Sequence, residues 1–208
     1  MSKPSPWPVV HAERQALADD LARLDAAQWT TPSLCSRWTV HQTLGHMVAA
    51  AKTTPATFFA GLARSGFRFE TLSAKNIARE TSGSPAETLQ AFRERISATT
   101  HPPGPSDTML GETIVHGEDI RRPLGISHAY PVAAVTRAAD FYASSNLLIG
   151  GKKRITGLTL RADDADWSIG DGAEVSGPAL SLLLAITGRT AALDDLSGQG
   201  LATLRSRM

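Results

Sequence analysis

The stretch DTMLGETIVHGEDIRRPLG, residues 107–125, decides the fold, because it has the pattern of one helix with a clear beginning and end. Ser106 or Asp107 can cap the helix N-terminus. Pro123 and Gly125 mark its end, because proline interrupts a helix and glycine is favoured just after the last turn. This one helix contains most of the ionisable residues that carry the functional argument.

Glu112 and His116 are four residues apart in this helix, so their side chains lie on one face, about 40° apart. Asp119 follows three residues later on that face. An unpaired carboxylate or imidazole would be costly in the apolar stripe formed there by Met109, Val115 and Ile120. A divalent metal would satisfy both groups, and Asp119 would hold the second ring nitrogen of His116 from outside the ligand set.

A second helix provides the third donor. Thr39 and Gln42 form a capping box that starts a helix running to about Thr53, before Pro55. His46 lies in this helix and flanks its apolar stripe, which consists of Val40, Leu44, Met47, Val48 and Ala51. We therefore predict a metal site formed by His46, Glu112 and His116. The alternative is an exposed ion pair or a hydrogen-bonded core histidine, because a Glu-x-x-x-His spacing alone does not identify a site.

The pattern elsewhere predicts a four-helix bundle over residues 1–150. Helices are expected at about residues 8–24, 84–99 and 132–148, with a lesser one at 72–79. Residues 151–208 differ, since Leu158 and Val175 lie on extended segments either side of a turn at Asp171 and Gly172. We expect a hairpin there, then an apolar helix ending at Gly188, in a small C-terminal α+β domain.

Composition excludes several classes of function. The 208 residues include 21 Lys and Arg and 20 Asp and Glu, so the net charge of +1 does not favour nucleic acid or anionic lipid. The apolar run at 179–187 is far shorter than the roughly 20 residues of a membrane span. Cys35 is the only cysteine, and the first ten residues lack a secretory signal pattern. We expect a cytoplasmic protein with no nucleic-acid or membrane partner.

Four residues have a functional and a structural interpretation. Cys35 is a redox thiol or a buried packing residue, and packing is favoured. Arg121 and Arg122 could bind a carboxylate, but the dipole at a helix end already explains basic residues there. Trp167 could line a ligand cleft, but is more simply a packing anchor.

Three segments resemble the DinB-like superfamily, and within it the mycothiol-dependent maleylpyruvate isomerase and related actinobacterial metal-binding proteins. They are PSLCSRWTV (32–40), ETIVHGEDIRRPLG (112–125) and DWSIGDG (166–172), followed by GPAL (177–180). The resemblance implies a four-helix bundle with a small C-terminal α+β domain. It also implies a zinc-type metal held by the residues matching His46, Glu112 and His116. The interval between the two ligand helices looks short for the isomerase, so the substrate-binding loops need not match.

Relatives in this family use the metal to bind and activate a low-molecular-weight thiol, which is transferred or serves as a cofactor in isomerisation. The resemblance therefore implies a metal-dependent thiol transferase or isomerase that takes mycothiol and a small organic substrate. A metal with two imidazoles, one carboxylate and an open position suits this chemistry, because it lowers the pKa of a bound thiol or water. Two alternatives stay open: a metal-binding or regulatory protein without turnover, and a metal-assisted hydrolase. A homodimer is left open too.

Overall fold

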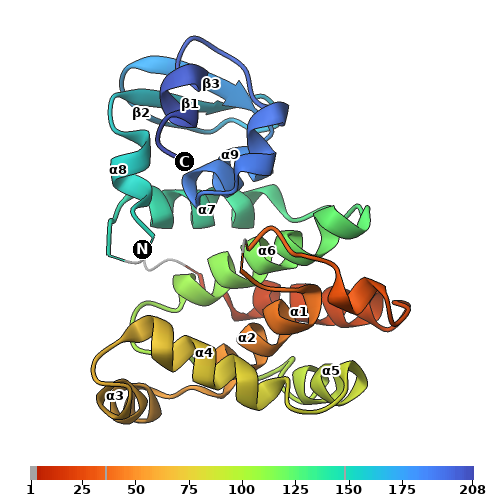
Figure 1. Cartoon of the computed structure of the whole chain (residues 1–208). Helices are drawn as coiled ribbons and strands as arrows, with labels where there is room; N and C mark the ends of the chain where they lie inside the picture. Colours follow the sequence, from red (N-terminus) through yellow and green to blue (C-terminus); the bar gives the residue numbers. More distant parts are fainter. Residues whose placement is uncertain (1–3, 36, 148) are drawn as a thin grey trace. The chain divides into compact units, whose positions relative to one another are not determined.

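The computed structural model describes residues 4–35, 37–147 and 149–208 (Figure 1). Its contacts divide the chain into two compact units, Met1–His128 and Ala129–Met208. The sequence pattern predicts a domain boundary between residues 150 and 151. By contacts, helix α7 (Val132–Ala143) instead belongs to the second unit, where it packs against α9 (Ala179–Ile186). The predicted mainly helical fold with a small α+β part near the C-terminus is confirmed.

The named elements of the first unit are all helices, and an isolated β-bridge joins Pro32 to Thr39. Its α-helices are α1 (Trp7–Leu21), α2 (Val40–Lys52), α3 (Pro55–Arg64), α4 (Phe69–Glu80), α5 (Pro85–Arg93) and α6 (Asp107–Arg121). Short 3-10 segments occupy Gln28–Thr30 and Arg122–Leu124. Helix α2 packs against both α4 and α6 (Figure 1). This central position of α2 brings His46 next to α6.

Capping boxes begin three of these helices. At the start of α2, the Thr39 hydroxyl accepts the N–H of Gln42, and the Gln42 side chain accepts the N–H of Thr39. Ser84 and Glu87 form the same arrangement at α5. These two starts were predicted from the sequence and are confirmed. A third box, at Thr54, begins α3, and the lesser helix expected at 72–79 is the later part of α4.

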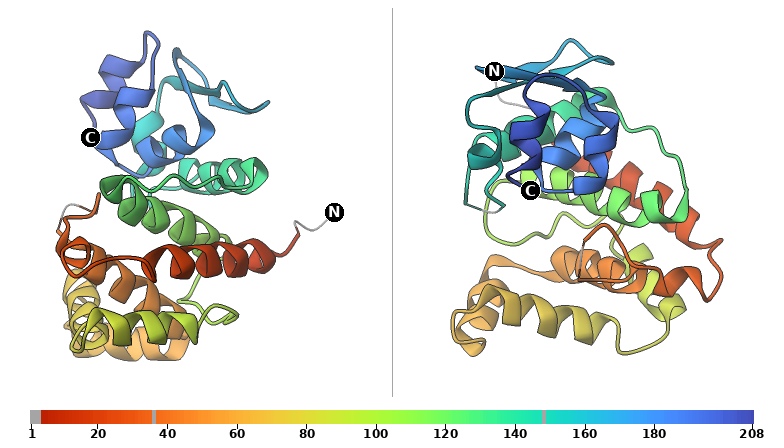
Figure 2. Two further views of the ribbon diagram at one scale, coloured as in Figure 1. Left: turned by 90° about the vertical axis from the view of Figure 1, so that its right-hand side faces the viewer. Right: turned by 45° about the horizontal axis from the view of Figure 1, so that its top comes forward.

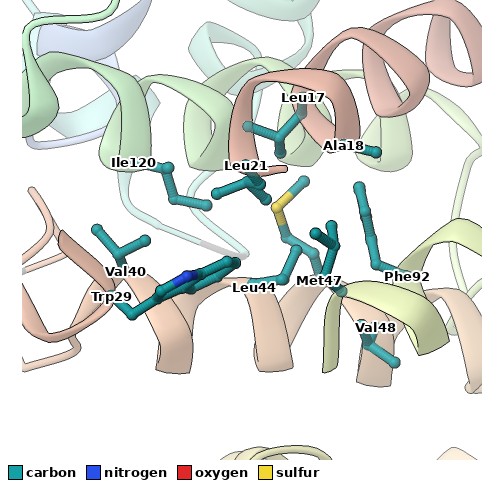
Figure 3. Packing of buried hydrophobic residues seen from close by; sticks show 11 residues of the cluster. Leu17, Ala18, Leu21, Trp29, Val40, Leu44, Met47, Val48, Phe92 and Ile120 are labelled. Atoms are coloured by element: carbon teal, nitrogen blue, oxygen red, sulfur yellow. The ribbon is translucent and has the colours of Figure 1, made fainter. Parts of the chain in front are cut away.

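A four-helix arrangement is present around one apolar core. Figure 3 shows Leu17 and Leu21 of α1 facing α2, with Phe92 of α5 and Ile120 of α6 completing the cluster. The side chains of Leu17, Phe92 and Ile120 are fully buried. Burying a side chain of this size contributes about 1.5–3 kcal/mol relative to exposure, so this cluster fixes how α2 and α6 meet. The four α-helices around this core are α1, α2, α5 and α6. The helix predicted at 132–148 is α7, which ends at Ala143 and contributes no described residue to this core.

The second unit contains a three-stranded sheet of β1 (Leu158–Ala162), β2 (Ser168–Gly170) and β3 (Ala173–Gly177), in the order β2-β1-β3 (Figure 1). Figure 2 shows the same strands in blue from two further directions. Strand β1 pairs antiparallel with β2 and parallel with β3. The expected hairpin between the segments of Leu158 and Val175 is therefore wrong. The turn at Asp171 and Gly172 joins β2 to β3, and β3 then lies on the far edge of β1.

Helix α9 forms the core of the second unit. It is apolar all round and almost entirely buried, and it contacts α7, β1 and β3. Shorter helical segments complete the unit: α8 (Gly151–Ile155), the 3-10 segment Thr190–Asp195 and α10 (Leu201–Arg205). In the described part of the chain, no helix combines the length and apolar character needed to cross a membrane.

Candidate metal centre

The predicted donors come together at the contact between α2 and α6. His46 extends from α2, and Glu112 and His116 extend from α6. One ligand atom from each of the three residues can be chosen so that all lie within 4.8 Å of one another. The side chains are 20%, 19% and 13% exposed, in that order. The cluster is thus partly buried and partly exposed to solvent.

The imidazole of His46 and the carboxylate of Glu112 are close without being hydrogen-bonded. Nε2 of His46 lies 3.6 Å from Oε1 of Glu112, which is beyond hydrogen-bond distance. Donors bound tetrahedrally to one zinc ion at about 2.0–2.2 Å stand about 3.4 Å apart. The two imidazole rings are 4.9 Å apart between centroids and inclined at 72°. The spacing of these donors therefore suits a shared cation.

Oε1 of Glu112 is buried and has no hydrogen-bond partner. Burial raises the pKa of the Glu112 carboxyl above its ordinary value, while the charges of His116 and Arg14 oppose that rise. Arg14 donates its own hydrogen bonds to the backbone carbonyls of Arg95 and Ala98. A buried carboxylate oxygen without a donor costs free energy, and a divalent cation would remove that cost. The residues present fit a metal on this ground.

Asp119 orients His116. Nδ1 of His116 lies 2.8 Å from Oδ2 of Asp119, whose side chain is fully buried. A hydrogen bond at Nδ1 leaves the lone pair on Nε2, which is the atom that would face a metal. The backbone carbonyl of Asp119 also accepts the N–H of Leu34, so the loop before α2 is tied to α6 at the same residue.

Trp38 lies next to both histidines, and no sequence signal predicts this contact. Its ring lies 4.8 Å from that of His46 and 6.1 Å from that of His116, measured between centroids. The backbone of Trp38 is anchored by Ser33, whose N–H and hydroxyl both donate to the Trp38 carbonyl. The only sequence signal was its position just before the capping box of α2. That position does not predict the contact with the histidines, which arises from tertiary packing.

Cys35 lies beside the site and is not the buried packing residue that was expected. Its side chain is partly exposed. Its sulfur forms a second compact group with donor atoms of His116 and Asp119, again within 4.8 Å of one another. The loop that carries Cys35 turns back onto α6 through Leu34, and this long-range contact could not be inferred from the neighbouring residues in sequence.

Arg121, Arg122 and Trp167 each form a contact within the protein, in agreement with their structural interpretation. Nε of the buried Arg121 donates to Asp20 at 2.8 Å, and Nε of Arg122 donates to Glu118 at 3.0 Å. The indole N–H of Trp167 donates to Asp140 of α7 at 3.0 Å. Each of these side chains has a partner that explains its position without a ligand.

Comparison with known proteins supports the resemblance found in the sequence. Residues 10–103 match the family model of the mycothiol maleylpyruvate isomerase N-terminal domain. The matched segment includes His46 and ends before Glu112 and His116. The positions of these two residues therefore come from the structure of α6 and not from the family match. A comparison with curated proteins finds no match.

Two solved structures resemble the whole chain. They are the crystal structure of the mycothiol-dependent maleylpyruvate isomerase, with a TM-score of 0.58, and that of a mutant of this isomerase, with 0.59. Each alignment covers 93% of this chain and 91% of the other, at 14% sequence identity. The chain thus shares the fold of that isomerase.

Proposed function

We propose that the chain is a metal-dependent enzyme that acts with a low-molecular-weight thiol, and that His46, Glu112 and His116 are the protein ligands of a zinc-type divalent metal. The observation that carries this proposal is the buried Oε1 of Glu112, which lacks a hydrogen-bond donor and lies 3.6 Å from Nε2 of His46. Two imidazoles and one carboxylate form a donor set typical of catalytic zinc, which keeps one position open.

When bound, such an ion would lower the pKa of a coordinated thiol or water and so provide a nucleophile near neutral pH. Residues around the three donors orient them for metal binding. Asp119 holds Nδ1 of His116, which keeps Nε2 free to bind. The indole ring of Trp38 lies next to both imidazoles and adds an apolar surface beside the donors. No protein nucleophile is required.

The likeness to known proteins supports the choice of thiol and of reaction class. The solved structures with the same fold are those of an isomerase described as mycothiol-dependent. We therefore propose mycothiol as the thiol and a small organic molecule as the second substrate, in an isomerisation or a thiol transfer. Both reactions begin with the same activated thiol, so the site is suited to either.

Native mass spectrometry tests this proposal. The protein is purified without added metal, loaded with zinc, and then incubated with mycothiol. We expect one zinc ion per chain and a further mass increase by mycothiol that depends on zinc. Zinc without any thiol complex would favour the hydrolytic or non-catalytic alternatives. The same spectra would show whether the chain forms the homodimer that the sequence leaves open.

A matched pair of variants makes the test specific to the site. Glu112→Gln keeps the shape of the side chain and removes its negative charge, so zinc should be lost at modest zinc concentrations. Glu118→Gln changes a buried carboxylate on the same helix that pairs with Arg122 and lies outside the donor cluster. It should keep its zinc. Equal zinc content in the two variants would contradict the proposed ligand set.

A further inference from the structure

A pocket lies in the first unit, and none of the three metal-site donors lines it. It has a volume of about 290 Å³ and is lined by residues from the end of α2, from α3 and from α4. Ligand pockets in proteins begin at about 300 Å³, so this space suits a small molecule. Thr53 contributes to its wall and follows His46 by two helical turns, about 10 Å along the axis of α2.

The charges around this pocket are positive. Lys52, Arg64 and Arg79 line it, and no Asp or Glu does. Glu80, which pairs with two of these lining cations, is only 8% exposed. Its two oxygens accept Nζ of Lys52 at 2.7 Å and Nε of Arg79 at 3.1 Å. One negative charge therefore faces three positive ones, and the excess favours an anion.

Glu80 holds two of these cations in place. Burial would raise the pKa of the Glu80 carboxyl, but its hydrogen bonds and ion pairs with Lys52 and Arg79 outweigh this and keep the pKa below its ordinary value. The carboxylate thus stays ionised at neutral pH. Lys52 and Arg79 each donate one N–H to the Glu80 carboxylate. The other N–H groups of both side chains can bind a ligand.

Two further side chains in the wall have unused hydrogen-bonding capacity. Among the described residues, the guanidinium of Arg64 makes no ion pair or hydrogen bond, and the amide of Asn76 makes none either. Arginine can bind a carboxylate or a phosphate through two parallel hydrogen bonds. Donors from α2, α3 and α4 therefore converge on one small space.

The rest of the wall is apolar. Phe58 and Leu72 face the pocket. The ring of Phe58 is held by edge contact with Phe59, at 5.5 Å between centroids, and lies 6.3 Å from the ring of Phe69. Such a combination of an apolar wall and a few convergent donors is typical of sites for small organic ligands.

We propose that this pocket binds a small organic anion, in which a carboxylate or phosphate group contacts Arg64 and its cationic neighbours and an apolar body lies against Phe58. The proposal does not depend on the metal. Nothing in it uses His46, Glu112 or His116, so a protein that binds no zinc could still bind this ligand.

Titration of the full chain by two-dimensional ¹H–¹⁵N NMR tests the proposal. The probes are benzoate and phenyl phosphate, with benzyl alcohol as the neutral comparison, all at constant ionic strength. We expect saturable shifts of backbone amides in residues 52–79 at ligand concentrations up to about 10 mM, well above the Kd of about 1 mM of a weak ligand. Binding of either anion supports the site, and the tighter one identifies the preferred oxyanion.

Two variants separate a specific site from general charge. Arg64→Gln removes an exposed side chain with no partner, so the fold should be unaffected, and the affinity for the anions should fall about tenfold or more. Lys75→Gln removes the same charge from α4 outside the pocket and should change affinity by less than about twofold. The proposal is overturned if neither anion binds saturably, if benzyl alcohol binds equally well, or if both variants have the same effect.

Discussion

Nδ1 of His116 lies 2.8 Å from Oδ2 of Asp119, and the Asp119 side chain is fully buried one turn further along α6. This pair determines which nitrogen of His116 is available to the site. A buried carboxylate also makes the imidazole a stronger ligand, because it stabilises the positive charge that the ring gains on binding a metal. The candidate centre therefore depends on more residues than its three donors.

His116→Ala should abolish stoichiometric zinc, with affinity reduced by more than the roughly 100-fold that marks the upper end of outer-shell effects. The control is His41→Ala, because His41 lies on α2 but bonds to Thr88 away from the donor cluster. Zinc content is measured by elemental analysis of folded protein, with helicity checked by circular dichroism. Full zinc content in His116→Ala would refute the ligand assignment.

Asp119→Asn should weaken zinc binding by roughly 10- to 100-fold without abolishing it, because the partner of His116 changes and the three donors remain. Competition with a chromophoric chelator measures this affinity. An effect as large as that of His116→Ala would indicate that Asp119 is itself a ligand. No effect at all would show that the hydrogen bond is irrelevant to binding.

Trp38 should report metal binding by its fluorescence, because its ring lies 4.8 Å from that of His46. Addition of Co²⁺, which quenches nearby indoles, should lower the emission of the wild-type protein, and Trp38→Phe should lose most of this response. Trp167→Phe is the control, since Trp167 lies in the second unit and bonds to Asp140. Quenching that survives in Trp38→Phe would place the ion elsewhere.

Glu80→Gln should destabilise the protein by about 1–2 kcal/mol at neutral pH, because a buried carboxylate loses its charge-assisted hydrogen bonds with Lys52 and Arg79. The folded-state pKa of Glu80 lies below its ordinary value. Its contribution is therefore complete above the unfolded pKa of about 4.3 and is lost as the pH falls through the folded pKa. Urea unfolding at several pH values measures the difference.

Glu70→Gln is the control for this pH dependence. Glu70 lies on the same helix, and its contact with Arg37 is 3.8 Å long and strongly exposed. An exposed pair of this kind contributes about 0–1 kcal/mol, so the variant should remain close to wild type at every pH. If Glu80→Gln is equally neutral, the pair with Lys52 has no structural importance.

Local signals in the sequence were sufficient for most helices of the first unit. The capping boxes at Thr39 and Ser84 define the starts of α2 and α5, because a cap satisfies backbone donors within a few residues. The face shared by Glu112, His116 and Asp119 also follows from helical spacing alone. The pairing of His116 with Asp119 needed no information from outside α6.

Longer-range packing decided the rest. Whether α7 joins the bundle or the second unit depends on which apolar surface it meets, and its own periodicity is compatible with both. Likewise, the alternation of buried and exposed residues in β1 and β3 does not reveal whether the strands pair parallel or antiparallel. For this reason the predicted hairpin was wrong. The pocket of Arg64 is lined from α2, α3 and α4, and no helical spacing within one of these segments predicts that contact.

By itself, the sequence determined which residues share a helix face, and so it identified His46, Glu112 and His116 as a possible donor set. Only the tertiary structure decided that α2 meets α6 at those faces, and that Trp38 and Cys35 lie beside them. The physical reason is the separation in sequence between the residues that interact. Helical geometry relates residues three or four apart, whereas contacts between His46 and Glu112 depend on how the buried side chains of Leu44, Ile120 and Phe92 fill one core.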